Sequence, residues 1–213
     1  MFDKSEIEQQ VAEFLLQIKA IKLQPNNPFT WASGWKSPIY CDNRITLSHP
    51  TIRTYIRQQL TRMVQDMFGS VGCIAGVATA GIPQGVLVAQ ELGLPFIYVR
   101  SKPKDHGTGN LIEGDILTPQ RVVVIEDLIS TGKSSLQAVE ALRSAGYDVA
   151  GLAAIFSYGF DVAANNFKEA NCPFVTLSNY DALIKYAGEN QYILPKDVEV
   201  LRQWRENPAE WGV

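Results

Sequence analysis

The middle of the chain alternates between short, continuously apolar segments and segments with helical periodicity. Strands are predicted at residues 73–77, 96–99, 122–125 and 149–156, and helices at 83–91 and 134–145. A strand without apolar–polar alternation is typical of a sheet covered on both faces, and helices between parallel strands provide that cover. The sequence therefore predicts an α/β fold, with a parallel sheet flanked by helices.

The ends of the chain carry further helix signals. Ser5 and Glu8 have capping-box spacing ahead of an apolar stripe, Pro50 is placed to begin a second helix, and Pro195 is placed to begin a last helix that ends at Asn207. A short strand is predicted at 39–41. No internal repeat or linker interrupts the chain, so we expect one domain over residues 1–213.

Composition excludes several classes of function. The 19 Lys and Arg residues do not outnumber the 22 Asp and Glu residues, so no basic excess favours nucleic acid. No apolar run approaches the ~20 residues of a membrane-spanning helix, and the first ten residues lack the apolar core of a signal peptide, so we expect a cytoplasmic protein without a membrane partner. Three scattered cysteines and two histidines do not form a zinc site, and no metal ligand is predicted.

The strongest strand, at 122–125, is followed by two acids and a hydroxyl-rich loop. Side chains alternate between faces, so one carboxylate is expected to face a ligand and accept hydrogen bonds from sugar hydroxyls while the other turns back. Hydroxyls, a glycine and the free amides of a helix N-terminus suit a phosphate. A ribose 5-phosphate site is the favoured reading, and a plain hydroxyl helix cap is the alternative. The segment reads Glu126, Asp127, Leu128, Ile129, Ser130, Thr131, Gly132, Lys133, Ser134 and Ser135.

A basic, glycine-rich loop follows the strand at 96–99. Arg100, Lys102 and Lys104 could neutralise a pyrophosphate, and His106 could donate to an oxygen whose charge grows as a bond breaks. The loop has few large apolar residues, so it is expected to be mobile. A solvated surface loop is the alternative.

The stretch 28–44 combines aromatic, hydroxyl and cationic side chains. Such a set could stack on a pyrimidine and pair with a carboxylate on it. The alternative is a packed loop whose aromatics, Trp31 and Tyr40 among them, belong to the core.

Four motifs resemble those of a known family. Residues 123–135 are similar to the phosphoribosyl-pyrophosphate (PRPP) signature of type I phosphoribosyltransferases, and 76–83 resemble their pyrophosphate loop. The pattern R-x-x-x-K-x-H-G, followed by I-E-G, resembles the catalytic loop of orotate phosphoribosyltransferases, and S-G-x-x-S-P at 33–38 resembles a segment near their start. The motifs occur in order over about residues 25–160.

The resemblance implies a type I phosphoribosyltransferase fold, with a small hood formed mainly by residues 1–45; the C-terminal segment is a second candidate for part of it. It implies transfer of ribose 5-phosphate from PRPP to orotate, giving orotidine 5′-monophosphate and pyrophosphate in pyrimidine biosynthesis. It also implies Mg²⁺ as cofactor and a homodimer whose basic loop acts in trans. Two alternatives stay open: a phosphoribosyltransferase for another base, and a PRPP-sensing regulator without enzymatic activity.

By resemblance, Lys104, His106 and Asp127 are the catalytic residues, and Ser130 and Lys36 contact orotate. The PRPP contacts are assigned to Arg100, Lys104, His106, Glu126, Asp127, Leu128, Ile129, Ser130, Thr131, Gly132, Lys133 and Ser134.

The chain departs from the pattern of many family members at several positions. Ala32 and Ser101 stand where many members have Lys, and Thr79-Ala80 stands where some have Tyr-Lys. Ser157-Tyr158-Gly159 follows a strand after which some members place an Arg. A strained or cis peptide near Ala78-Thr79 is expected by analogy.

Overall fold

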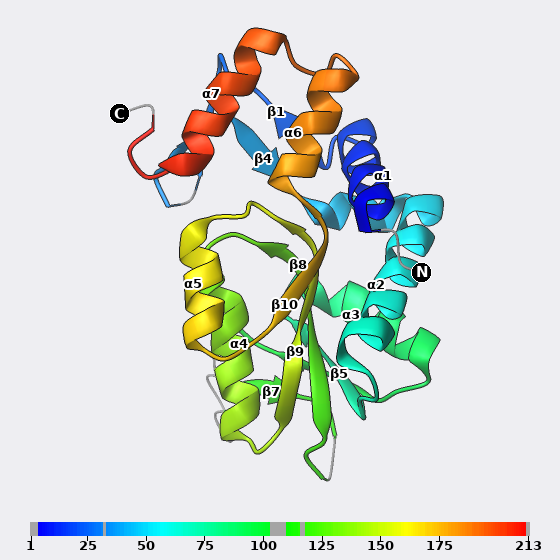
Figure 1. Ribbon diagram of the computed structural model, residues 1–213. Helices are drawn as coiled ribbons and strands as arrows, with labels where there is room; N and C mark the ends of the chain where they lie inside the picture. Colours follow the sequence, from blue (N-terminus) through cyan, green and yellow to red (C-terminus); the bar gives the residue numbers. More distant parts are fainter. Residues whose placement is uncertain (1–3, 32, 103–109, 116–117, 212–213) are drawn as a thin grey trace.

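The computed structural model describes residues 4–31, 33–102, 110–115 and 118–211, and its centre is a six-stranded sheet (Figure 1). The strand order is β10-β9-β8-β5-β6-β7, and all neighbours are parallel except β6 and β7. The strands are β5 (Cys73–Val77), β6 (Phe96–Val99), β7 (Ile112–Glu113), β8 (Arg121–Ile129), β9 (Asp148–Ser157) and β10 (Phe174–Asn179).

Helices cover both faces of the sheet. The α-helices of the described residues are α1 (Lys4–Gln17), α2 (Pro50–Phe68), α3 (Gly81–Leu92), α4 (Lys133–Ser144), α5 (Asp161–Glu169), α6 (Tyr180–Glu189) and α7 (Pro195–Glu206), of which α6 and α7 lie beyond one end of the sheet (Figure 1). Two small antiparallel pairs, β1 (Ile21–Leu23) with β4 (Ile39–Cys41) and β2 (Phe29–Thr30) with β3 (Lys36–Ser37), precede the 3₁₀ helix η1 (Asn43–Ser48).

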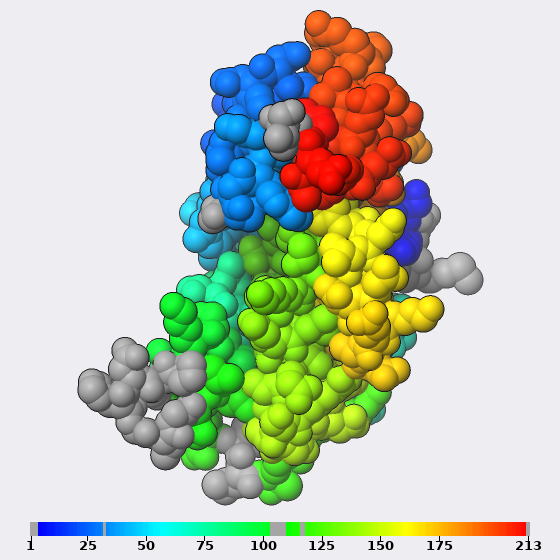
Figure 2. All heavy atoms as spheres, turned by 90° about the vertical axis from the view of Figure 1, so that its left-hand side faces the viewer, coloured from blue at the N-terminus to red at the C-terminus, as the bar shows by residue number. Residues whose placement is uncertain are grey.

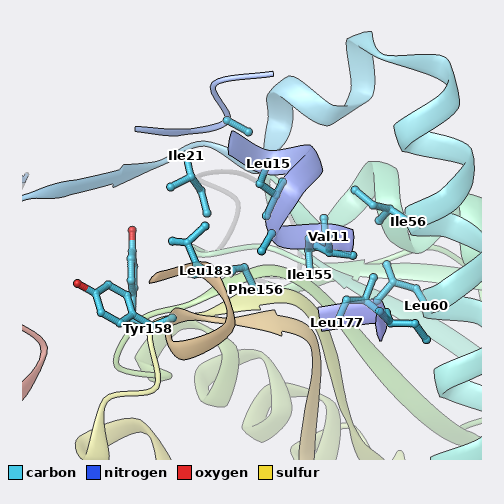
Figure 3. Packing of buried hydrophobic residues seen from close by; sticks show 14 of the residues in the cluster. Val11, Leu15, Ile21, Ile56, Leu60, Ile155, Phe156, Tyr158, Leu177 and Leu183 are labelled. Carbon is cyan, nitrogen blue, oxygen red and sulfur yellow. The ribbon is translucent and has the colours of Figure 1, made fainter. Parts of the chain in front are cut away.

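The alternation of side chains along β8 divides the core into two clusters. Val123 and Ile125 belong to a cluster that includes residues of α1 and α2, whereas Val122 and Val124 belong to a cluster that includes residues of α4 and α5. Figure 3 shows the first cluster, in which side chains of α1 and α2 meet those of β9 and β10. Burial on both faces explains why these strands are continuously apolar.

The C-terminal helices lie beside the N-terminal strands in a lobe beyond one end of the sheet (Figures 1 and 2). Trp204 of α7 is fully buried, and its indole Nε1 donates to the main-chain oxygen of Lys36 at 3.2 Å. Its ring also packs edge-on against Trp31 and Tyr158. These contacts attach the end of the chain to its beginning.

Most of the predicted elements are confirmed to within a few residues, including the strands at 73–77 and 96–99 and the helices opening at Pro50 and Pro195. Gly146 follows α4 with φ of 90°, in the left-handed conformation that ends helices. The capping box at Ser5 is wrong, because α1 already includes Lys4, and the Glu8 carboxylate accepts from Asn179 Nδ2 at 2.9 Å instead.

Two corrections concern the segments that carry the candidate site. β8 continues through Ile129, so residues 126–129, which were expected in a loop, belong to the strand. The loop after β6 contains β7, which returns antiparallel to β6 and makes the sheet mixed.

We expect Trp204→Ala to lower the free energy of unfolding by about 3–5 kcal/mol, because a fully buried indole and its hydrogen bond are both lost. Urea denaturation followed by circular dichroism would measure the change. Val162→Ala, at a 47% exposed position of α5, is the control and should change stability by no more than about 0.5 kcal/mol. A loss below about 1 kcal/mol for Trp204→Ala would contradict the docking of α7.

Candidate functional site

The order of the strands brings three separate segments to one edge of the sheet. From β5 the chain moves to β6 on one side and later to β8 on the other, so β5 and β8 flank a topological switch point. Ligands of open parallel sheets bind at such a point, beyond the carboxyl ends of the strands. The segments that meet there are the turn after β5, the loop after β6 and the end of β8.

The two acids of β8 differ in their burial and in their hydrogen-bond partners. Glu126 is 5% exposed, and its carboxylate accepts hydrogen bonds from the Ser135 hydroxyl at 3.1 Å and from the Asp127 amide at 3.0 Å. Its side chain is therefore held against the base of α4. Asp127 is half-buried, and its main-chain oxygen accepts a hydrogen bond from Asn43 of the N-terminal segment. The prediction that one acid would turn back is confirmed, and Glu126 is the one that does.

Burial raises the pKa of both carboxyls. For Glu126 the charge of Asp127 is the next cause, and the pKa lies well above its ordinary value of 4.5. For Asp127 burial outweighs the opposing influences, which include the hydrogen bond with Glu126 and the positive charge of Arg44. Hydroxyl donors from a bound sugar would relieve part of this desolvation.

Asn43 connects the N-terminal segment to this strand. Its amide Nδ2 donates to the main-chain oxygen of Asp127 at 2.7 Å, and its Oδ1 accepts from the Cys41 thiol at 3.3 Å. Asn43 is 1% exposed. Burial raises the pKa of the Cys41 thiol, with the charges of Asp127 and Asp42 adding to the effect, so the thiol remains a donor at neutral pH.

The turn from β8 into α4 is shaped for close approach of a ligand to the backbone. Gly132, with φ of 78°, stands at the N-cap of α4, and no side-chain hydrogen bond caps the helix there. A Cβ at Gly132 would lie 2.8 Å from the Phe167 ring, so a larger residue would not fit there. Asn166 Nδ2 donates a hydrogen bond to the main-chain oxygen of Thr131 at 3.0 Å. The alternative of a plain hydroxyl cap is therefore wrong, because a glycine occupies that position.

Other residues of this segment differ in exposure. Ser130 and Thr131 are half-buried, and Lys133 and Ser134 are exposed on the first turn of α4. Leu128 is half-buried and Ile129 is buried, so side-chain contact with a ligand is less available to Ile129 than main-chain contact.

The turns after β5 and β6 lie next to this segment. The Ala78–Thr79 peptide is cis, as the resemblance implied. Arg100 makes an ion pair with Glu113 of β7 at 3.4 Å. Ala78, Arg100 and Ser134 line one cleft of about 950 Å³, which continues along α4 as far as Tyr147. Lys104 and His106 lie outside the described residues.

The aromatic residues near the N-terminus divide between core and surface. Trp31 packs against Tyr158, and its indole donates to the main-chain oxygen of Ile39 at 3.1 Å, so its assignment to the core is confirmed. Tyr40 is 40% exposed, so a core role for its ring is wrong. The Lys36 Nζ donates to the Thr30 hydroxyl at 2.8 Å, within the β2–β3 hairpin.

Sequence reasoning did not single out Asn43, although it lies two residues after a predicted strand. Its neighbours Asp42 and Arg44 form a two-bond ion pair, Nε to Oδ1 at 2.7 Å and Nη2 to Oδ2 at 2.8 Å. The run of polar residues after the strand at 39–41 was the available signal.

In the described part of the chain, His, Cys, Asp and Glu side chains form no group of three suited to hold a metal ion. Within the same residues, every helix is too short or too polar to cross a membrane.

Comparison with known proteins gives consistent results. The model of the phosphoribosyl transferase domain family matches residues 47–185. An orotate phosphoribosyltransferase of Phocaeicola vulgatus is 60% identical over 205 residues, which are 96% of this chain and 97% of that relative. The structure of orotate phosphoribosyltransferase from Aeropyrum pernix matches with a TM-score of 0.74 and 26% identity, over 86% of this chain and 99% of that one. Leishmania donovani UMP synthase, a longer chain of which 42% is covered, matches 92% of this chain with a TM-score of 0.77 and 25% identity.

The raised pKa of Glu126 makes a prediction about stability. Between the ordinary value of 4.5 and the raised pKa, the folded chain keeps a proton that the unfolded chain has lost, so stability falls as pH rises through this window and stays lower above it. Glu126→Gln cannot ionise, and we expect it to be more stable than the unmodified chain at neutral pH.

Urea denaturation at neutral pH and near pH 4.5 would measure this difference, which should shrink at the lower pH. Glu140→Gln, at an exposed position of α4, is the matched control and should show no such pH dependence. The opposite result would be a Glu126→Gln variant that loses stability, relative to the unmodified chain, as the pH rises from 4.5 to neutral. It would show that the carboxylate form is stabilising.

Proposed function

The chain belongs to the orotate phosphoribosyltransferases, within the phosphoribosyl transferase domain family, and from this premise we propose how its residues carry the reaction. The enzyme transfers ribose 5-phosphate from PRPP to orotate, a step of pyrimidine biosynthesis. Each role below is a proposal about this chain.

Asp127 is the residue that binds the ribose hydroxyls. One observation supports this role above others: a half-buried carboxylate stands two residues before the end of β8, and the turn that follows leads into a helix that lacks a side-chain cap. Glu126 supports Asp127, since its carboxylate accepts a hydrogen bond from the main-chain amide of Asp127 and is itself held by the Ser135 hydroxyl. The acid pair and the helix are thus spaced for the two ends of a ribose 5-phosphate.

The 5′-phosphate binds at the turn from β8 into α4. The segment Leu128–Ser134 would contribute main-chain amides, and the hydroxyls of Ser130, Thr131 and Ser134 would add donors. Gly132 allows the close approach of the backbone that these bonds need. Lys133, exposed on the first turn, adds positive charge.

Arg100, Lys104 and His106 neutralise the pyrophosphate. Arg100 lines the same cleft as Ser134, and its side chain is 34% exposed, so it can exchange its ion pair with Glu113 for a ligand phosphate. No covalent nucleophile is needed: displacement at the anomeric carbon through an oxocarbenium-like transition state requires in-line reactants and stabilisation of the departing charge. Closure of the loop over the site would exclude water that hydrolyses PRPP.

Mg²⁺ is proposed to arrive with PRPP. Mg²⁺ favours oxygen ligands and is often bound through substrate phosphates rather than by a cage of side chains. Pyrophosphate oxygens supply such ligands, and the bound ion would spread the negative charge that develops on the leaving group.

Orotate is proposed to bind between the end of β8 and the N-terminal segment, near Ser130. Lys36 is the first candidate for its carboxylate, although in the free chain its ammonium is bonded to Thr30. The identity to orotate phosphoribosyltransferases over almost the whole chain favours this acceptor over another base, and favours catalysis over a role as PRPP-sensing regulator. We also propose a cytoplasmic homodimer in which Lys104 and His106 act on the partner's site.

Mixed dimers test the roles of the loop and the acid strand together. Lys104→Ala and Asp127→Asn should each lower turnover by about 100-fold or more, because each removes a charged contact to the transition state. If the loop acts in trans, a heterodimer of the two variants contains one site with both residues intact. Its activity should recover to about half that of the unmodified dimer.

Two affinity tags would isolate the heterodimer, and turnover of orotate would be followed directly. Homodimers of each variant, taken through the same mixing and purification, are the controls. Inactive heterodimers of verified composition would show that the loop serves its own subunit.

A further inference from the structure

Orotate differs from uracil by a carboxylate, so the acceptor site needs a positive group that can reach it. At the position after β9, this chain has Tyr158, which is 2% exposed and uncharged at neutral pH because burial raises the pKa of its phenol well above the ordinary value. The Lys36 ammonium is bonded within its own hairpin. The positive group that pairs with the orotate carboxylate is therefore expected on another element.

Arg44 lies beside the ribose-binding acid. The preceding residue, Asn43, donates to the main-chain oxygen of Asp127 at 2.7 Å, which places this segment against the end of β8. The positive charge of Arg44 is one of the influences that oppose the burial-driven rise in the Asp127 pKa. The Arg44 side chain is 62% exposed, so its guanidinium is open to a ligand. Because the base is joined to the anomeric carbon of the ribose, its binding site must adjoin that of the ribose hydroxyls.

Asp42 fixes the orientation of this guanidinium. Its two oxygens accept from Arg44 Nε at 2.7 Å and from Nη2 at 2.8 Å, and Oδ1 also accepts from the Arg44 amide at 3.2 Å. These side-chain bonds use two of the five guanidinium N–H groups, so three remain for a ligand. A planar fork held in place is well suited to a second carboxylate.

An exposed aromatic ring accompanies the cation. Tyr40 is 40% exposed, two residues before Asp42, and its phenol is among the groups that raise the pKa of Arg44, after Asp42. A flat face beside a positive group matches the chemistry of a pyrimidine that carries an acid.

A surface ion pair without function is the competing explanation, and the chain contains a suitable comparison. Arg205 Nη1 pairs with Asp181 Oδ2 at 2.9 Å, and both side chains are accessible to solvent. The difference lies in position, because the Arg205 pair joins α7 to α6, whereas the Arg44 segment is bonded to Asp127. Arg205 therefore provides the control.

We propose that Arg44, oriented by Asp42, binds the carboxylate of the pyrimidine acceptor and determines the preference for orotate over uracil. The proposal rests on the proposed function, since it places the acceptor next to the ribose site at Asp127. It assigns to Arg44 a role that the sequence motifs led us to give to Lys36.

The test compares ligands with and without the carboxylate. Isothermal titration calorimetry would measure the affinities of orotidine 5′-monophosphate, uridine 5′-monophosphate and PRPP for the unmodified chain and for Arg44→Gln, Arg44→Lys, Lys36→Gln and Arg205→Gln. Loss of a charged hydrogen bond of about 1.5–3 kcal/mol corresponds to a 10- to 100-fold weaker affinity. We expect Arg44→Gln to weaken orotidine 5′-monophosphate by this factor and to change the other two ligands less than about threefold.

Arg44→Lys should recover part of the affinity, because it keeps the charge but not the planar fork. Arg205→Gln should match the unmodified chain. The orotate KM of Arg44→Gln should rise by a similar factor, with a smaller change in kcat.

Equal weakening of both nucleotides by Arg44→Gln would overturn the proposal, because it would show a role in ribose binding or in folding. Selective weakening of orotidine 5′-monophosphate by Lys36→Gln but not by Arg44→Gln would overturn it in favour of Lys36. The affinities of the two nucleotides are measured without turnover, so they test the role of Arg44 even if the unmodified chain consumes no orotate. A chain that consumes no orotate would instead contradict the proposed function.

Discussion

The hydrogen bond from Asn43 Nδ2 to the main-chain oxygen of Asp127, at 2.7 Å, joins the two parts of the molecule that form the site. β5 last pairs with β8 at Gly76 and Ile125, but β8 continues to Ile129. The carbonyl of Asp127 therefore projects beyond the last residue that β5 can pair with. A buried main-chain oxygen without a donor is unfavourable, and Asn43 supplies the donor in place of a strand.

The same residue links this edge to the helix that follows β5. The Thr46 hydroxyl donates to the main-chain oxygen of Asn43 at 2.6 Å, and Gln84 Nε2 of α3 donates to that hydroxyl at 3.3 Å. The acceptor side, the ribose side and the first turn of α3 are thus connected by buried hydrogen bonds. Their relative placement is set by protein contacts before any ligand binds, which lowers the entropy lost on binding.

The electrostatics of the free site favour ligands with hydroxyl and anionic groups in separate places. Burial makes the carboxylates of Glu126 and Asp127 poorly solvated, so they gain from hydroxyl donors. A few residues further along, the uncapped N-terminus of α4 offers amides to a phosphate. These opposite preferences within one short segment are what the proposed binding of a sugar phosphate by a single strand–turn–helix unit requires.

The sequence by itself determined the parallel core and the segment proposed to bind ribose phosphate, because both depend on local patterns. Continuous β-branched residues at 122–125 and a glycine between hydroxyls need no distant partner to be recognised. It did not predict where β8 ends, because Glu126 and Asp127 have low strand propensity, and pairing with β9 overrides that propensity. Nor did it predict β10, α5 and α6, or which acid turns inward. Which acid turns inward depends on Ser135, nine residues from Glu126, and the attachment of the end of the chain depends on the contact of Trp204 with Lys36, 168 residues away. Only the tertiary structure decides such contacts, because the energy of a buried hydrogen bond depends on which groups the fold brings together and removes from water.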